Sequence, residues 1–253
     1  MPNRLYIRTL FGVLPFIVIG ATWLILTEAG LVDQVFLPSI PKVVSALYRV
    51  FAHEGYFHDL LISIYRVMAA FVVSAVLAIP LGLLTGYSKR MAELVEPFVG
   101  FVRYLPVPAF IPLCILWFGL GNSGKIAIIF LGTFFQLILM IADIAREVPR
   151  PLFEAAYTLG ATRKRLFFRV LWPATMPGIV NAGRIAIGWA WTYLVVAEIA
   201  GATSGLGYRI MEAQRYIQAP KIFAGIVIIG ILGVITDLLF RSMHRLLFPW
   251  LES

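Results

Sequence analysis

Charged residues are scarce in this chain. Asp, Glu, Lys and Arg make up 13% of its 253 residues, whereas soluble domains carry about 25%. Hydrophobic residues make up 60%, against about 45–50% in soluble domains, so the composition argues against a soluble protein. Acidic residues are fewer than basic ones, with 13 Asp and Glu against 21 Lys and Arg, so the net charge is +8. The positions of the basic residues decide what that excess means.

Metal-binding and disulfide-forming residues are also few. The single cysteine, Cys114, rules out an intramolecular disulfide framework and a cysteine-based zinc site. His53 and His58 are five residues apart, a spacing that places them on different faces of a helix, and His244 is far away in the sequence. We therefore expect no metal site in this chain and no cofactor bound by it.

Long uncharged runs, by contrast, are abundant. A helix rises about 1.5 Å per residue, so roughly 20 mostly uncharged residues cross a hydrocarbon core of about 30 Å. Six stretches meet or approach that length, which predicts an all-α integral membrane protein with one transmembrane domain over residues 1–253. The expected spans cover approximately residues 9–27, 64–88, 99–119, 125–143, 177–200 and 222–240. Gly82 and Gly86 permit close approach of another helix, either within the subunit or in a dimer.

The first apolar run has two interpretations. Arg4 and Arg8 precede it and the small residues Ala29 and Gly30 follow it, as in a secretory signal peptide. However, the run from Thr9 to Thr27 is longer than the roughly 7–15 residues of a signal-peptide core. We therefore expect an uncleaved membrane anchor.

Lys and Arg residues concentrate in alternate loops. Twelve lie on one side of the expected spans, namely Arg4, Arg8, Lys89, Arg90, Arg146, Arg150, Arg163, Lys164, Arg165, Arg169, Arg241 and Arg245. Six lie on the other side, and three lie in or beside spans. Because basic residues resist translocation, both termini are expected to face the cytoplasm in a multi-pass protein of the cell (inner) membrane. No continuous basic face remains to follow phosphates, so no nucleic acid partner is expected.

The outward-facing segment 28–62 is expected to contain one interfacial helix. Ser39 and Pro41 form a helix start, and Val43, Leu47 and Val50 then recur at helical spacing. Contact with the lipid membrane and packing on neighbouring spans both fit this pattern.

The segment 143–176 is the longest loop on the cytoplasmic side, and a long loop in a compact protein is usually functional. It predicts two short helices. The first follows Pro149 and stops at Gly160, and the second is capped by Thr162 and ends before Pro173. The apolar face of the first helix would fill a groove on another protein.

Residues in this loop match a known pattern. The loop contains Glu154-Ala155-Ala156, then Gly160 after three residues, and then Val170-Leu171-Trp172-Pro173 after nine more. This arrangement resembles the EAA-loop pattern of ABC-importer membrane subunits. That pattern is EAA, three residues, G, nine residues, I, any residue, L, P. Val170 and Trp172 depart from it, and both are apolar.

The resemblance covers about residues 37–250. One branch of the family imports taurine, sulfonates, nitrate, bicarbonate and some vitamin precursors. The chain is similar to this branch at Ser63-Ile64-Tyr65-Arg66, Arg103-Tyr104-Leu105-Pro106, Trp117-Phe118-Gly119-Leu120-Gly121, Gly183-Arg184-Ile185, Ala197-Glu198 and Gly205-Leu206-Gly207. The Trp-Phe-Gly-x-Gly run is nearest the taurine and sulfonate type. The resemblance implies the six-helix permease fold of a type I ABC importer.

The resemblance further implies a transport subunit rather than an enzyme. Two permease copies, as a homodimer or with a similar second permease, would form the pore. Two ABC ATPase subunits, which bind ATP and Mg, would hold the EAA helices, and an extracytoplasmic solute-binding protein would deliver the solute. The residues implied at the ATPase-coupling surface are Glu154, Ala155, Ala156, Gly160 and Pro173. A simpler interpretation of Glu154 is that its charge only favours the helix N-terminus through the helix dipole.

One nucleotide-binding motif is nearly present. Gly119, four residues, Gly124 and Lys125 form most of a phosphate-binding loop, but Ile126 replaces the Ser or Thr that holds magnesium. The motif also joins two membrane spans instead of following a strand. ATP hydrolysis by this chain is therefore not expected.

The expected solute is a small oxyanion or sulfonate, such as taurine, an alkanesulfonate, nitrate or bicarbonate. A neutral vitamin or pyrimidine precursor is the alternative within the same family. An ion-coupled secondary transporter is the rival from another class. It would require inverted internal repeats and coupling charges near the membrane midplane, and we find neither in this sequence.

Four charged residues fall in or beside the spans, where a charge needs a partner or a wet cavity. They are Arg66, Arg103, Arg184 and Glu198. The arginine side chains beside a passage would suit an anion. These four charged residues together form the candidate substrate pathway. In the alternative interpretation, Arg66 and Arg103 extend to the membrane interface and Arg184 is in a structural ion pair. Asp237 and Arg241, four residues apart, are expected to pair locally.

Overall fold

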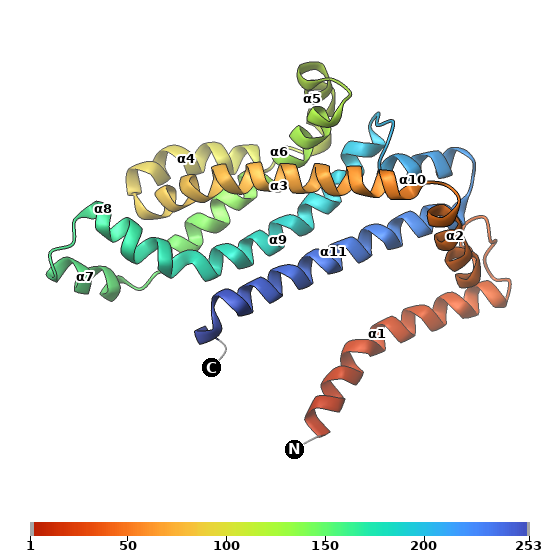
Figure 1. The fold of residues 1–253 in the computed structure, drawn as a ribbon, viewed down its shortest axis with the longest axis horizontal. Helices are drawn as coiled ribbons and strands as arrows, with labels where there is room; N and C mark the ends of the chain where they lie inside the picture. The colour runs from red at the N-terminus through yellow and green to blue at the C-terminus, as the bar shows by residue number, and fades with distance from the viewer. Residues whose placement is uncertain (1–2, 252–253) are drawn as a thin grey trace.

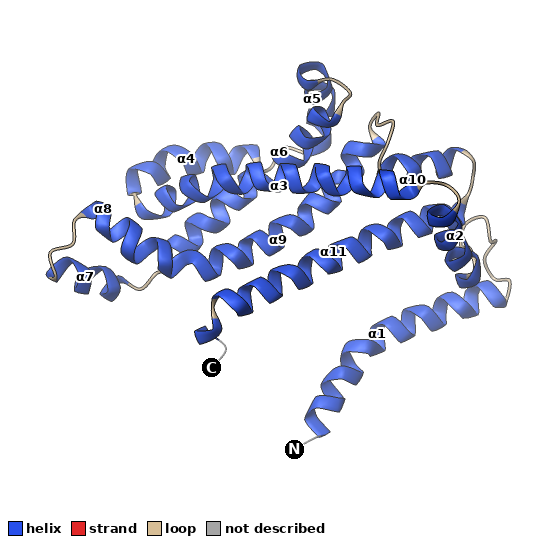
Figure 2. Ribbon diagram, in the orientation of Figure 1, coloured by secondary structure: helices blue, strands red, loops and turns tan. Residues whose placement is uncertain are grey.

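The computed structural model describes residues 3–251, with side chains from Val13 to Leu251, and regular structure in that range is helical throughout (Figures 1 and 2). The longest helices are α1 (Asn3–Glu28), α3 (Tyr56–Tyr87), α6 (Asn122–Arg146), α9 (Trp172–Ile199) and α11 (Ala219–Leu247). The shorter ones are α2 (Ile40–Ala52), α4 (Lys89–Val102), η1 (Val107–Phe110), α5 (Ile111–Phe118), α7 (Arg150–Thr158), α8 (Arg163–Leu166), η2 (Phe167–Leu171), α10 (Leu206–Arg215) and η3 (Pro249–Leu251). The all-α class expected from the sequence is confirmed.

The described residues contain four helices that are long and apolar enough to cross a membrane. These run over Tyr56–Tyr87, Asn122–Arg146, Arg163–Ile199 and Ala219–Leu247. A fifth span is present if α4 and the segment Val107–Phe118 count as one bent pair. Within α1, the part with described side chains is the apolar stretch Val13–Glu28, which is shorter than these spans. The expected count of six spans is therefore not confirmed.

The expected span over residues 99–119 is not one helix. α4 begins at Lys89 and ends at Val102, and the chain then bends by 87° before Val107–Phe118. Pro106 lies at the bend and Pro108 follows it. A proline lacks the backbone N–H that continues a helix, and it disfavours helical geometry in the residue before it. Hydropathy alone does not report this break, because the residues around it are apolar.

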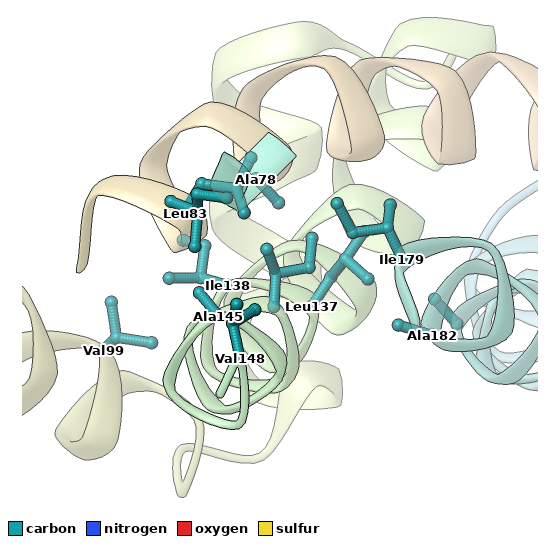
Figure 3. Close-up of a cluster of buried hydrophobic side chains, with 12 residues drawn as sticks. Ala78, Leu83, Val99, Leu137, Ile138, Ala145, Val148, Ile179 and Ala182 are labelled. Carbon is teal, nitrogen blue, oxygen red and sulfur yellow. The ribbon is translucent and has the colours of Figure 1, made fainter. Parts of the chain in front are cut away.

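The bundle is built around α3, α6 and α9, and two clusters of buried apolar side chains lie along their contacts. One cluster, shown in Figure 3, includes Ala78, Leu83, Ile138, Ile141 and Ile179 and reaches Val99 of α4. The other includes Val67, Ile128, Ile129, Ala190 and Leu194. Lipid chains are as apolar as these side chains, so close van der Waals contact holds membrane helices together.

Gly82 and Gly86 form the close contact between α3 and α6. A Cβ atom on Gly82 would lie 2.7 Å from Ile141 Cβ, and one on Gly86 would lie 2.4 Å from the carbonyl oxygen of Ala142. Both distances are shorter than any real Cβ contact, so only glycine fits at either position. Of the two roles expected for this glycine pair, the structure supports packing within the subunit.

Several short helices lie at opposite ends of the bundle, whereas α5 projects from its side (Figure 1). α7, α8 and the junction of α3 with α4 lie at one end, called here the α7 end, and α2 and α10 lie at the other, the α10 end. α1 and α11 each have one terminus near the α10 end and extend from there toward the chain termini. The basic loop 143–176 therefore lies opposite α2, as the alternation of loops requires.

The helix expected from Ser39 onward is present as α2, with Ser39 at its N-cap position. Its buried residues Val43, Ala46 and Val50 form one face, and α2 packs against α11. The two helices expected in the basic loop are also present, since Gly160 has φ +78° after α7 and Thr162 caps α8.

One boundary in this loop differs from the expected one, because the helix does not end before Pro173. α8 continues through the π-helical turn Phe167–Leu171 into α9, which has Pro173 in its first turn. A π turn shifts the backbone hydrogen bonds by one residue, and it lies directly before the proline, which has no N–H to donate. The helix therefore passes the proline and enters the bundle.

Candidate functional site

A buried ion pair joins α3 to α9 near the α10 end of the bundle. Arg66 Nη1 lies 2.7 Å from Glu198 Oε1, and the two residues are 3% and 1% exposed. Ser63 Oγ donates to the same carboxylate oxygen at 2.8 Å, and the Gly207 amide donates to Glu198 Oε2 at 2.7 Å. Three donors therefore hold Glu198, as a buried carboxylate requires.

The other nitrogens of Arg66 also have acceptors. Nε donates to Asn122 Oδ1 at 2.9 Å, and Nη1 and Nη2 donate to the carbonyl oxygen and the hydroxyl of Ser204 at 2.8 Å and 3.2 Å. One guanidinium group thus ties α3 to the start of α6 and to the loop between α9 and α10. The interpretation that Arg66 extends to the membrane interface is wrong, because protein groups neutralise its charge inside the bundle.

A second ion pair extends this network to α10. Asp59 Oδ1 accepts from the Gly205 amide at 2.6 Å, and Asp59 Oδ2 accepts from Arg209 Nε at the same distance. The Leu206 amide donates to Ser63 Oγ at 2.9 Å. Burial lowers the pKa of Arg209, but hydrogen bonds to Asp59 and Glu212 outweigh it and raise that pKa above the usual value. Arg209 therefore remains a cation at any physiological pH.

The loop residues Gly205 and Gly207 lie directly against Glu198. Gly205 has φ +110°, and a Cβ atom there would lie 2.3 Å from Glu198 Oε1. A Cβ atom on Gly207 would lie 2.7 Å from Glu198 Cβ. Only glycine allows this loop to approach the carboxylate closely enough for the amide of Gly207 to bind it.

The Ser63–Arg66 motif thus forms one structure with the Ala197-Glu198 and Gly205–Gly207 motifs, which lie more than 130 residues later in the chain. The Arg66–Glu198 cluster comprises Asp59, Ser63, Arg66, Asn122, Glu198, Ser204, Gly205, Leu206, Gly207 and Arg209. Sequence reasoning missed Asp59 and Arg209. A signal for Asp59 was present, because Asp59, Ser63 and Arg66 are spaced four and three residues apart and so share one helix face.

Lys125 lies beside this cluster and is 2% exposed. Its Nζ donates to the carbonyl oxygen of Leu120 and to that of Gly201, the latter at 3.2 Å. Lys125 therefore closes the turn between α5 and α6 and is not available to a phosphate. This contact agrees with the interpretation that Gly119–Lys125 is not a nucleotide-binding loop.

Arg103 lies at the break between α4 and η1 and is exposed. Its Nη2 donates to the hydroxyl of Tyr104 at 3.0 Å, and its guanidinium lies 4.8 Å from the centre of that ring. A small cavity beside it is lined by Gln136, near the middle of α6, and by Tyr193 of α9. Arg103 is therefore at mid-depth in the bundle and does not contact Arg66, Arg184 or Glu198.

Arg184 forms an ion pair on the other half of the bundle. Its Nε contacts Asp237 Oδ1, and Arg241 Nε contacts Asp237 Oδ2 at 2.8 Å. The expected local pair of Asp237 and Arg241 is confirmed, and Arg184 is in a structural pair, as one interpretation held. The structure thus brings two of the four candidate pathway residues together, Arg66 and Glu198, and leaves the other two apart.

The first helix of the basic loop, α7, presents a largely exposed surface at the α7 end. Phe153 packs against Tyr87, with ring centroids 6.2 Å apart, and Tyr87 also contacts Phe167. Leu152, Tyr157 and Leu159 are exposed, the last by 88%. A cavity of about 350 Å³ is lined by Phe153, Glu154, Tyr157, Thr158 and Leu166. α7 is therefore packed against the bundle through Phe153 and against α8 and η2, and it offers apolar side chains outward.

Glu154, Ala155 and Gly160 are exposed on this helix, and Ala156 is half-buried. Glu154 is the fifth residue of α7 and therefore lies beyond the first turn. The helix dipole acts mainly on charges within the first turn, so the dipole has little effect on Glu154. Pro173 is not part of α7 but lies in the first turn of α9.

A family model described as "Binding-protein-dependent transport system inner membrane component" matches residues 78–252. The chain belongs to this family. The permease is 36% identical to the putative aliphatic sulfonates transport permease protein SsuC of Bacillus subtilis, over 100% of this chain and 91% of the relative. It is 29% identical to the taurine transport system permease protein TauC of Escherichia coli, over 92% and 86% of the two chains. It is also 30% identical to the formylaminopyrimidine transport permease protein ThiX of Halalkalibacterium halodurans, over 93% of each.

The fold of the permease is similar to that of a solved ABC transporter. A chain of the MetNI methionine ABC transporter in an inward-facing conformation matches it with a TM-score of 0.68 and 22% identity. The match covers 75% of this chain and 94% of that one. The permease therefore has an ABC-importer permease fold, and the relationship to the sulfonate and taurine branch inferred from the motifs is confirmed.

Proposed function

We propose that this permease translocates a small oxyanion or sulfonate by alternating access, driven by separate ATPase subunits that hold α7. The exposed surface of α7 carries this proposal, because it is anchored to the bundle by Phe153 and presents Leu159 and Tyr157 outward. Movement of a helix held in this way would transmit to α9 through the continuous helix from Arg163 to Ile199. Membership of the importer family removes the support for an ion-coupled secondary transporter.

In this proposal the coupling surface comprises Glu154, Ala155, Ala156, Gly160 and Pro173. Small side chains at Ala155 and Ala156 allow a partner to approach closely, and Gly160 ends the helix with a backbone that needs a positive φ. Glu154 is exposed and supplies a negative charge for a basic or hydroxyl group of the partner. Pro173 contributes indirectly, by its place where the loop enters α9.

The exposed position of Arg103 supports the presence of a second permease copy. An exposed arginine at mid-depth cannot face lipid without a large cost, of about 2.5–3.5 kcal/mol by insertion scales. Apolar side chains surround it on the same stretch of chain, among them Phe101 and Tyr104, which are 66% and 76% exposed. We propose that a second copy covers this face and that the solute passes between the two copies, beside Arg103.

The similarity to SsuC and TauC, together with the cation at Arg103, favours a solute that carries a sulfonate or oxyanion group. An extracytoplasmic binding protein would deliver it to the α10 end, and the ATPases would lie at the α7 end, with both termini cytoplasmic and the complex in the inner membrane. The excess of Lys and Arg in the loops at the α7 end supports this orientation.

The alternative solute is a neutral pyrimidine or vitamin precursor, and the similarity to ThiX favours it. The test is to reconstitute the permease in liposomes with its ATPase and binding protein and to measure ATP hydrolysis and uptake across a solute panel. We expect stimulation by taurine, an alkanesulfonate, nitrate or bicarbonate. Stimulation by a neutral pyrimidine alone would replace the anion proposal with the alternative. Uptake without ATP would overturn the proposed coupling.

A further inference from the structure

A basic cavity of about 500 Å³ lies between α9 and α11, in the halves of these helices nearer the α7 end. Polar and charged side chains line much of it, namely Asn181, Arg184, Arg241, His244 and Arg245. Arg184 and Arg241 each direct Nε toward one oxygen of Asp237, so two guanidinium groups share one carboxylate. Two guanidinium groups on one carboxylate leave one net positive charge in the Arg184–Asp237–Arg241 group, which favours an anionic ligand.

An apolar cavity of about 370 Å³ adjoins the basic one. Its lining comes from four helices and includes Phe71 and Ala75 of α3, Leu137 of α6, Met176 of α9 and Met243 of α11. Val180 and Phe240 line both cavities, so the two meet at these side chains. None of the residues around the apolar cavity is charged, so it offers no group that would hold a hydrated solute.

We propose that the two cavities together bind one anionic phospholipid. Its phosphate lies on the arginines of the basic cavity, and an acyl chain lies in the apolar cavity. A small oxyanion would use only the first cavity and a neutral amphiphile only the second, whereas an anionic lipid matches both. The planar, always charged guanidinium group binds phosphate with two parallel donors, which favours the phosphate over a more weakly charged head.

The depth of the arginines agrees with a lipid headgroup. Arg241, His244 and Arg245 lie in the last two turns of α11, which ends at Leu247. A helix of 29 residues is longer than the hydrocarbon core requires, so its last turns reach the headgroup region. Basic pockets between spans on the cytoplasmic side bind anionic headgroups. This inference rests on the proposed orientation of the chain and not on the identity of the transported solute.

Bound lipid would hold α11 to the rest of the bundle. Of the four apolar spans among the described residues, α11 has the smallest share of its apolar stretch buried in the protein. An acyl chain in contact with α3, α6, α9 and α11 would add van der Waals contact where the protein alone leaves a gap. We therefore expect anionic lipid to raise the thermal stability of the permease.

The experiment uses the full-length permease in phosphatidylcholine nanodiscs that contain a minor fraction of phosphatidylglycerol. Native mass spectrometry counts the phosphatidylglycerol molecules that remain bound after transfer to detergent. Arg241→Gln with Arg245→Gln removes two charges from the basic cavity, and Lys89→Gln with Arg90→Gln is the matched control at the start of α4. Ala75→Phe fills the apolar cavity, and Val76→Phe, at a position 64% exposed, is its control.

We expect one retained phosphatidylglycerol per permease, with retention about fivefold lower for each arginine removed. Ala75→Phe should also lower retention, while both controls should match the wild type. Monodispersity and the unfolding temperature in phosphatidylcholine alone show whether a variant has folded. If Ala75→Phe fails to fold, the charge variant still tests the proposal, because its substitutions lie on the cavity surface. Equal retention in the charge variant and its control would overturn the proposal.

Two further arms distinguish the source of the anion. Sodium phosphate and hexanesulfonate are added to permease that has been stripped of lipid, and binding is measured for the wild type and the Arg241→Gln, Arg245→Gln variant. If hexanesulfonate binds with the same dependence on the arginines and phosphatidylglycerol is not enriched, the cavities form a solute site and the lipid proposal is wrong. Failure of the lipid test leaves the proposed anion transport untouched, because transport is measured separately by uptake.

Discussion

Arg66 and Glu198 are 132 residues apart in the sequence, and their side chains meet at 2.7 Å inside the bundle. The pair fixes α3 against α9 and orders the loop that leads to α10, through the amide of Gly207 and the carbonyl oxygen of Ser204. Charges of this kind cost free energy when buried, and they are tolerated here because Arg66 donates four hydrogen bonds to protein acceptors and Glu198 accepts three. The geometry therefore gives Arg66 and Glu198 a role in holding the α10 end together.

Removing one member of this pair should be strongly destabilising. Arg66→Met leaves Glu198 buried without its cation, and we expect a loss of about 3–5 kcal/mol in the free energy of unfolding. The double variant Arg66→Met, Glu198→Met removes both charges and should recover part of that loss. Arg146→Gln, in a half-exposed surface pair, is the control and should cost less than about 1 kcal/mol. Thermal unfolding in detergent measures all three, and an Arg66→Met protein as stable as the control would contradict the assignment.

Gly86 sets the distance between α3 and α6, and adding one methyl group there should separate them. Gly86→Ala places a Cβ atom 2.4 Å from the carbonyl oxygen of Ala142, which belongs to the backbone and cannot rotate away. We expect destabilisation of roughly 1–3 kcal/mol. Gly188→Ala is the control, because nothing lies within 4 Å of its Cβ position and alanine favours a helix. Equal unfolding temperatures for the two variants would show that α3 and α6 are not in close contact at Gly86.

Reversing the charge of Glu154 should uncouple transport from ATP hydrolysis without affecting the fold. Glu154 is exposed, so Glu154→Arg should insert normally and keep the wild-type unfolding temperature. We expect at least a tenfold fall in uptake per ATP hydrolysed, measured in proteoliposomes with the ATPase and binding protein. Glu93→Arg, an equally exposed charge reversal on α4, should retain uptake. Wild-type uptake by Glu154→Arg would rule out this residue as a coupling residue.

Arg103 should act through its positive charge if it lies beside the solute passage. Arg103→Gln keeps a polar side chain but removes the charge, and we expect sulfonate uptake to fall about tenfold, equivalent to about 1.4 kcal/mol. Arg103→Lys keeps the charge and should retain most of the uptake. Uptake assays at saturating binding protein make the comparison. If both variants lose uptake equally, the geometry of the guanidinium and its contact with Tyr104 matter rather than the charge.

The exposed face around Arg103 should lie against a second permease copy. In a Cys114→Ser background, Tyr104→Cys places a thiol at a position 76% exposed. We expect a bifunctional maleimide to form a covalent dimer in native membranes. Phe16→Cys on α1, 77% exposed, is the control and should not cross-link. Monomer alone at Tyr104→Cys, under conditions that label the thiol, would place this face against lipid or another protein.

Local patterns were enough to predict much of this protein. The scarcity of charge and the long apolar runs determined an all-α membrane protein, because lipid offers no hydrogen bonds and only a helix satisfies its own backbone there. The spacing from Glu154 to Pro173 is likewise a local feature, and it identified the family and the loop that became α7 and α8. These features depend on neighbours in the sequence, so no tertiary information was needed to read them.

The tertiary structure alone decided the partners of the intramembrane charges. Composition marked Arg66, Arg184 and Glu198 as costly, but only the packing of α3 against α9 and of α9 against α11 pairs Arg66 with Glu198 and Arg184 with Asp237. It also decided the use of Gly82 and Gly86 within the subunit. Contacts between distant segments depend on how helices cross, and the sequence of one helix does not contain its neighbour's position.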